Sequence, residues 1–209
     1  MATTTTNYGW DIPQSTDLVK DGATAIATLG QDIDTSVYTA LAGKKSGLVL
    51  LNTTSFSAVS SQSINDVFSA TYDNYRILVN VSSASATATL GFRFRVSGSD
   101  DSNNVYRFGG WYASMESGVS GFDSNATGTS FLTSSHISGA YPTYTQLEIA
   151  QPFSAAPTPI QATFTYNNGV YTASQRLGTH TNSTSFTGFT LVASSGNVTG
   201  RVLTYGYNQ

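Results

Sequence analysis

The chain has 209 residues, of which 39% are hydrophobic and 12% aromatic, enough to fill a core. Only 10% are charged and the net charge is −3, so the sequence lacks the concentrated basic surface that nucleic-acid binding needs. It contains no cysteine, which excludes disulfides and thiolate metal sites. Serine and threonine supply most of the polarity, and threonine favours strands. The composition therefore indicates a folded, mainly β protein.

The sequence offers no targeting signal and no membrane anchor. Residues 1–6 lack the basic and apolar regions of a secretory signal, and the longest aliphatic run, residues 48–51, is too short to span a bilayer. We therefore expect neither secretion through a signal peptide nor membrane insertion.

The first 15 residues are predicted to be an extended docking peptide. Pro13 disfavours a helix at the residue before it. The apolar side chains that precede it have no core of their own in so short a segment, and exposed aromatic side chains often anchor a complex. The predicted virion-docking residues are Tyr8, Trp10, Ile12 and Pro13.

Residues 16–42 have the apolar spacing of a helix, with Ser15 or Thr16 as N-cap and Gly43–Lys45 after its end. Two glycines, Gly22 and Gly30, weaken it, so a helix of this length needs a partner. The apolar stripe predicts self-association through Leu18, Ile26, Leu29, Ile33 and Val37. We therefore assign residues 1–45 to attachment and oligomerisation, and residues 46–209 to a β domain.

From residue 47 onward the apolar period becomes two, which is typical of strands. Asn168-Gly169 between two alternating runs predicts a hairpin. With no helical pattern between the strands, we expect a jelly-roll-like antiparallel β-sandwich. The nine predicted strands are 48–51, 75–81, 90–96, 105–112, 144–150, 160–166, 170–177, 186–192 and 198–207.

No arrangement of residues predicts catalysis. His136 and His180 are the only histidines, and neither lies in a nucleophile motif. A glycosidase would need two carboxylates across a sugar bond, but Glu116, Asp123 and Glu148 carry no pattern that pairs them. We predict that the chain is not an enzyme and needs no cofactor.

Two segments have a binding and a structural interpretation. The oxygen-rich residues 97–104 could ligate Ca²⁺, but Asp, Asn, Ser and Gly are also ordinary turn residues, and we favour the turn. The aromatic cluster 108–112 is either a core strand at a bulge or a platform for a sugar or a protein. In the second interpretation, Trp111 and Tyr112 are candidate receptor-binding residues.

Residues 7–13, 16–23, 25–26, 29–30 and 33–34 resemble the N-terminal module of small tail-fibre-like proteins of tailed bacteriophages. Residues 47–51, 67–77 and 200–207 look like the β domain that often follows that module. The resemblance implies a virion protein, commonly a homotrimer, whose N-terminus faces the particle, and it brings no catalytic residues. The implied partners are further copies of the chain, other virion proteins, and a glycan or protein of the host surface.

Two alternatives share the predicted architecture. A head decoration or cement protein would use the same domain to tie capsomers together. A free carbohydrate-binding module would need no virion at all.

Overall fold

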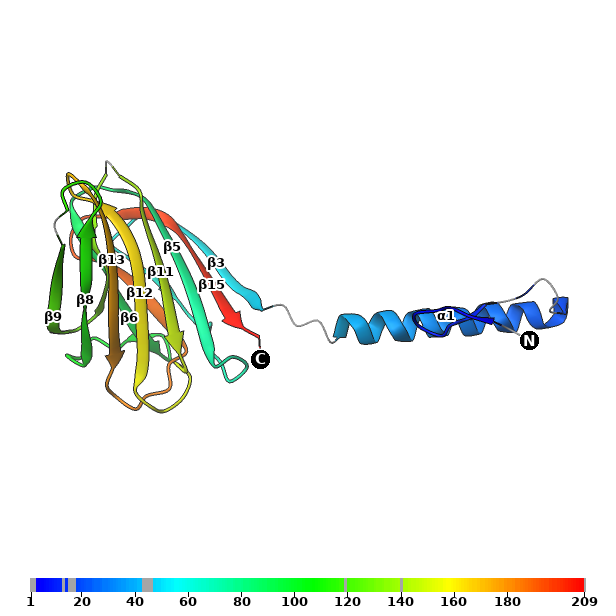
Figure 1. The fold of residues 1–209 in the computed structure, drawn as a ribbon. Coiled ribbons are helices and arrows are strands. Elements are labelled where there is room, and N and C mark those ends of the chain that lie inside the picture. Colours follow the sequence, from blue (N-terminus) through cyan, green and yellow to red (C-terminus); the bar gives the residue numbers. More distant parts are fainter. Residues whose placement is uncertain are drawn as a thin grey trace. The chain divides into compact units, whose positions relative to one another are not determined.

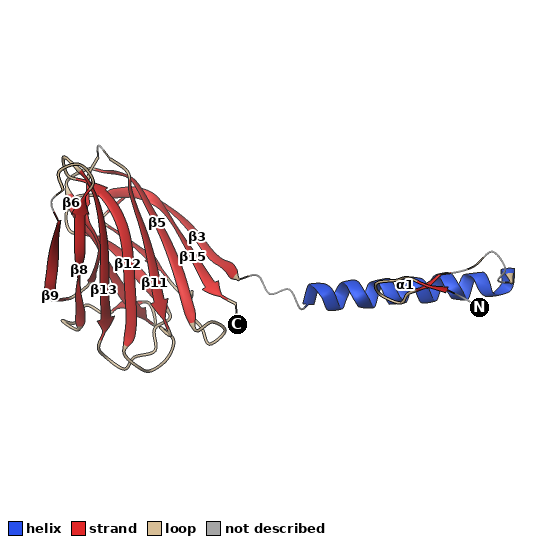
Figure 2. Cartoon of the chain, in the orientation of Figure 1, coloured by secondary structure: helices blue, strands red, loops and turns tan. Residues whose placement is uncertain are grey.

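The computed structural model describes residues 3–12, 14, 18–42, 47–118, 120–139 and 141–208. The chain divides into two compact units, Met1–Ser46 and Gly47–Gln209 (Figure 1). Helix and strands are segregated between them, as Figure 2 shows, apart from a small hairpin in the first unit. The predicted mainly β fold with one N-terminal helix is confirmed.

The N-terminal peptide is a two-stranded hairpin. Strand β1 (Thr3–Thr4) pairs antiparallel with β2 (Asp11–Ile12). Gly9 has a φ of 69°, a left-handed conformation that glycine adopts without strain, and its N–H donates to the Thr5 carbonyl at 3.0 Å. The segment is not helical, in line with the prediction, but it folds back on itself through a turn and is extended only in its two short strands. Pro13 lies outside the described residues.

Helix α1 (Val19–Ala42) follows the hairpin and confirms the predicted helix. The predicted cap residues 15–17 and the predicted end at 43–45 lie outside the described residues. Residues 22, 25, 29, 32 and 36 are half-buried and recur at helical spacing, which defines one face that is partly covered. The neighbouring apolar stripe stays exposed and consists of Ile26, Ile33, Val37 and Leu41.

The second unit contains two antiparallel sheets. The larger sheet has eight strands in the order β3 (Leu48–Val59), β15 (Val198–Tyr207), β5 (Asn74–Ala84), β11 (Thr143–Ala150), β12 (Thr158–Asn167), β13 (Tyr171–His180), β8 (Tyr106–Ser114) and β9 (Ser120–Gly128). The smaller sheet has the order β10 (Phe131–Ile137), β6 (Ala88–Val96), β14 (Gly188–Ala193) and β4 (Ser61–Ile64), with β7 (Ser99–Asp100) paired to β6.

The connections between the sheets follow the jelly-roll scheme of eight antiparallel strands in two sheets. In chain order, the strands β3, β4, β5, β6, β10, β11, β14 and β15 form one neighbouring set β3-β15-β5-β11 and a second set β4-β14-β6-β10. If the eight are numbered 1 to 8, these sets read 1-8-3-6 and 2-7-4-5, which is the jelly-roll order. Two hairpins, β8-β9 and β12-β13, widen the larger sheet beyond it.

Side chains from both sheets meet in one apolar core. In the smaller sheet, Phe92 stacks on Phe189 with ring centroids 5.1 Å apart. Phe94 stacks at 4.4 Å on Phe186, which precedes β14. The larger sheet contributes alternate residues of β5, β11 and β12, including Ile77, Val79, Leu147 and Phe164. The alternation leaves the intervening residues of the larger sheet on its outer face.

All nine predicted strands are present, and β12 and β13 form the predicted hairpin around Asn168-Gly169. The sequence did not predict β4, β7, β9 and β10. In β10 the buried residues include Thr133 and Ser134, whose hydroxyls hide the alternation of polarity. In β9 the strand is mostly small and polar, and Phe122 is 87% exposed.

Candidate binding surface on the large sheet

The outer face of the larger sheet places two rows of side chains next to each other. In the first row, Arg76, Glu148, Gln161 and Leu177 are successive cross-strand neighbours on β5, β11, β12 and β13. The second row lies two residues farther along each strand and contains Leu78, Gln146, Thr163, Gln175, Trp111 and Phe122. Because strands repeat every two residues, both rows point away from the core.

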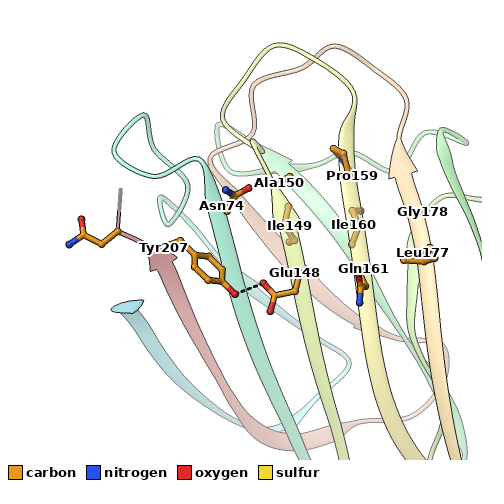
Figure 3. Close-up of a pocket in the computed structure, with 11 residues that line it drawn as sticks. Asn74, Glu148, Ile149, Ala150, Pro159, Ile160, Gln161, Leu177, Gly178 and Tyr207 are labelled. Atoms are coloured by element: carbon orange, nitrogen blue, oxygen red, sulfur yellow. Dashed lines mark hydrogen bonds between the residues drawn. The ribbon is translucent and has the colours of Figure 1, made fainter. Parts of the chain in front are cut away.

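An open pocket of about 530 Å³ lies over one end of this face (Figure 3). Tyr207 extends from β15 past β5 to Glu148 on β11, while Gln161 and Leu177 follow on β12 and β13. The polar lining residues are Asn74, Glu148, Gln161, Tyr207 and Asn208.

Three donors hold the Glu148 carboxylate in place. Its Oε1 accepts hydrogen bonds from Arg76 Nε at 2.6 Å and from Gln146 Nε2 at 3.2 Å. Its Oε2 accepts the Tyr207 hydroxyl at 2.8 Å. The Arg76 guanidinium also lies over the Tyr207 ring, 5.6 Å from its centroid. A carboxylate has roughly four acceptor positions, so one stays open to a ligand hydroxyl.

The protonation states in this network follow from its contacts. The hydrogen bond to Glu148 raises the pKa of Arg76, so that its positive charge is retained. Burial, followed by the hydrogen bond to Glu148, raises the pKa of Tyr207. Tyr207 therefore remains protonated at neutral pH and donates its hydroxyl to the carboxylate.

Trp111 is the aromatic centre of the second row. It is 42% exposed, and its indole Nε1 donates to Gln175 Oε1 at 3.2 Å. Its cross-strand neighbour on β9 is Phe122. The predicted bulge is present as a register shift between Phe108 and Gly110.

Tyr112, the second candidate receptor-binding residue, occupies the opposite face of β8. A Cβ placed on Gly121 would lie 2.6 Å from the Tyr112 hydroxyl, so this ring packs over Gly121. The exposed partner of Trp111 is thus Phe122, a residue that sequence reasoning missed because β9 was not recognised. Gln161, Gln175 and Tyr207 were missed as well, and the only local signal for them is a polar residue at alternate positions of a predicted strand.

The oxygen-rich loop has partners within the protein. The Asp100 carboxylate pairs with Arg95 and accepts the Thr190 hydroxyl at 2.6 Å. The Asp101 carboxylate lies 3.0 Å from His180 Nε2 and also accepts the Asn103 backbone N–H. These contacts support the turn interpretation.

The other candidate catalytic and metal-binding residues do not come together in one site, as far as the chain is described. Over the described residues, there is no group of three or more His, Asp or Glu side chains placed to hold a metal ion. Glu148 belongs to the network above, and Glu116 lies in the turn after β8, where it accepts the Tyr171 backbone N–H at 3.4 Å. The Asp123 side chain lies outside the described part. Within that part, no helix is long and apolar enough to cross a bilayer.

The N-terminal candidate residues are only partly available to a partner. Trp10 stacks on Tyr8 with ring centroids 5.1 Å apart, and its Nε1 donates to Ser36 Oγ of α1 at 2.9 Å. Tyr8 stays 67% exposed, and Ile12 is also exposed. Contrary to the expectation from sequence, Trp10 therefore packs against the helix of its own chain.

The candidate oligomerisation residues occupy two sides of the helix. Leu18, Ile26, Ile33 and Val37 are exposed in the single chain. Leu29 is half-buried and lies seven residues before Ser36, on the face that Trp10 contacts.

Comparisons with protein-family models, with curated proteins and with solved structures gave no match.

Proposed function

We propose that this chain is a structural protein of a bacteriophage virion, of the tail-fibre or adhesin type. Its N-terminal unit attaches it to the particle, and its β-sandwich is displayed for binding to the host surface. The observation that carries the proposal is the outer face of the larger sheet, where exposed Trp111 and Phe122 share a row with the amides of Gln175 and Gln146. Aromatic side chains and amides are typical of binding surfaces.

The N-terminal unit supports the attachment role. Its exposed stripe of Ile26, Ile33, Val37 and Leu41 has no cover in the single chain as far as it is described. A short helix is stabilised mainly by packing of its apolar face. Three copies would bury this stripe on one axis, and the hairpin would then present Tyr8 and Ile12 to the particle.

Attachment is tested by the Tyr8→Ala variant, which leaves the Trp10–Ser36 hydrogen bond intact. We expect this variant to fold and to be lost from purified virions when quantified by mass spectrometry. Tyr171→Ala, which removes an exposed tyrosine from the sandwich, is the matched control and should be incorporated normally. Normal incorporation of Tyr8→Ala would place attachment elsewhere.

Display to the host is tested by competition. Purified full-length protein in excess should reduce adsorption of particles to host cells. If adsorption is unchanged, and particles that lack the protein release their genome on mild heating, the head-decoration alternative replaces the adhesin proposal.

A further inference from the structure

We infer that the pocket beside Glu148, Gln161 and Tyr207, together with the adjoining row that ends at Trp111, is one continuous site for a neutral oligosaccharide. This inference rests on the proposed function, because it names the chemistry that the displayed sheet recognises at the host surface.

The charge of the pocket selects a neutral ligand. Glu148 is its acidic residue, and Arg76 balances that charge at 2.6 Å. No lysine, arginine or histidine lines the described part of the pocket, so an anionic ligand would find no free cation there. A cationic ligand would have to displace Arg76 from the carboxylate. An uncharged ligand that carries hydroxyl groups needs no free cation and leaves the Arg76–Glu148 pair in place.

The hydrogen-bonding groups suit hydroxyls. The side-chain amides of Asn74 and Gln161 line the pocket, and each offers both a donor and an acceptor. Sugar hydroxyls are likewise donors and acceptors at once. Glu148 is held rigidly by Arg76 and Tyr207, which lowers the entropic cost of using its open acceptor position.

The apolar groups extend the site along the sheet. Leu177 is 55% exposed beside Gln161, and Trp111 lies on the next strand, β8, in the adjacent row. Glu148 and Trp111 are separated by β12 and β13, a distance of roughly 14 Å at ordinary strand spacing. The apolar face of a sugar ring can stack on an indole. The span therefore fits several linked sugar units.

The test uses fluorescently labelled full-length protein and intact host cells. One sample of cells is treated with periodate, which oxidises the vicinal diols of glycans, and another with a protease. We expect periodate to abolish binding and protease to leave it. Gln161→Ala and Trp111→Ala should each weaken binding by roughly tenfold or more, because each removes a ligand contact. Gln62→Ala, on β4 of the other sheet, is the matched control and should bind like the wild type.

The outcomes are distinguishable. Binding that is lost after protease and kept after periodate would overturn the saccharide inference in favour of a protein receptor, while the proposed function would stand. Periodate-sensitive binding that both Gln161→Ala and Trp111→Ala leave unchanged would overturn this site and also leave the function standing. Failure of the wild-type protein to bind host cells at all would overturn both.

Discussion

At the scale of single residues, the core depends on stacked aromatic rings. Phe94 is fully buried and contacts the rings of Phe92, Tyr106 and Phe186. Phe94→Ala should lower the free energy of unfolding by about 3–5 kcal/mol, since it leaves a cavity. Phe122→Ala removes the same side chain from an exposed position and should change stability by no more than about 0.5 kcal/mol. Urea denaturation compares the two, and equal effects would contradict the described packing.

His180 makes stability depend on pH. Burial lowers the pKa of His180 below its usual 6.5, and the Asp101 carboxylate, 3.0 Å away, partly offsets this. Just below pH 6.5 the unfolded chain therefore binds more protons than the folded chain. The contribution of neutral His180 to the free energy of unfolding is fully present above pH 6.5 and is lost as the pH falls below it. Urea denaturation at pH 7.5 and at lower pH should show this loss. The His180→Asn variant should be less stable at every pH, and its free energy of unfolding should fall less between the two pH values. An equal fall in the variant and the wild type would contradict this role of His180.

At the scale of elements, the bulge in β8 positions Trp111. A Cβ at Gly110 would clash with the carbonyl oxygen of Gln175 on β13, so this close approach requires glycine. Gly110→Ala should destabilise the sandwich by roughly 1–3 kcal/mol and should disturb the Trp111 fluorescence. Gly47→Ala is the control, because a Cβ there meets no atom within 4 Å. Equal melting temperatures of the two variants would contradict the strand pairing.

We predict that the chain forms a trimer through helix α1. Sedimentation equilibrium should give about three times the 22.1 kDa of one chain. Ile33→Asp should shift the protein toward the monomer, since three carboxylates would converge on an apolar axis. Gln31→Asp adds the same charge to another exposed position of the helix and should leave the trimer intact. A monomeric wild-type protein at micromolar concentration would refute the assembly, and a dimer would refute its stoichiometry.

The elements that could be predicted from sequence are those with a strong period of apolar residues. Residues 90–96 alternate large apolar side chains with arginines, and the helix repeats isoleucine and leucine at helical spacing. Strand β10 was not predicted because its residues Thr133 and Ser134 are polar yet buried, and Thr133 Oγ1 donates to the Leu90 carbonyl at 2.9 Å. A buried hydroxyl with a hydrogen-bond partner looks like a surface residue in the sequence.

The candidate binding surface was predictable only in part. The sequence singled out Trp111 from its neighbours, yet it could not show that Trp111 lies beside Phe122 and Gln175. The pocket combines Tyr207, Glu148 and Gln161 from strands β15, β11 and β12. Their proximity depends on strand order and register, which no local pattern records.

At the scale of the whole molecule, the two compact units present different surfaces. The unit Met1–Ser46 presents an exposed apolar stripe and aromatic side chains that suit contacts with protein. The unit Gly47–Gln209 presents a hydroxyl-rich, weakly charged sandwich with an open pocket. We propose that the first unit is fixed to the particle and that the second is displayed to the host.

This arrangement is tested by electron microscopy of virions that carry a gold label at the C-terminus of this protein. We expect gold at the tail or baseplate, on the side that faces the host cell. Gold distributed over the capsid shell, or virions without gold although the labelled protein is produced and folded, would contradict it.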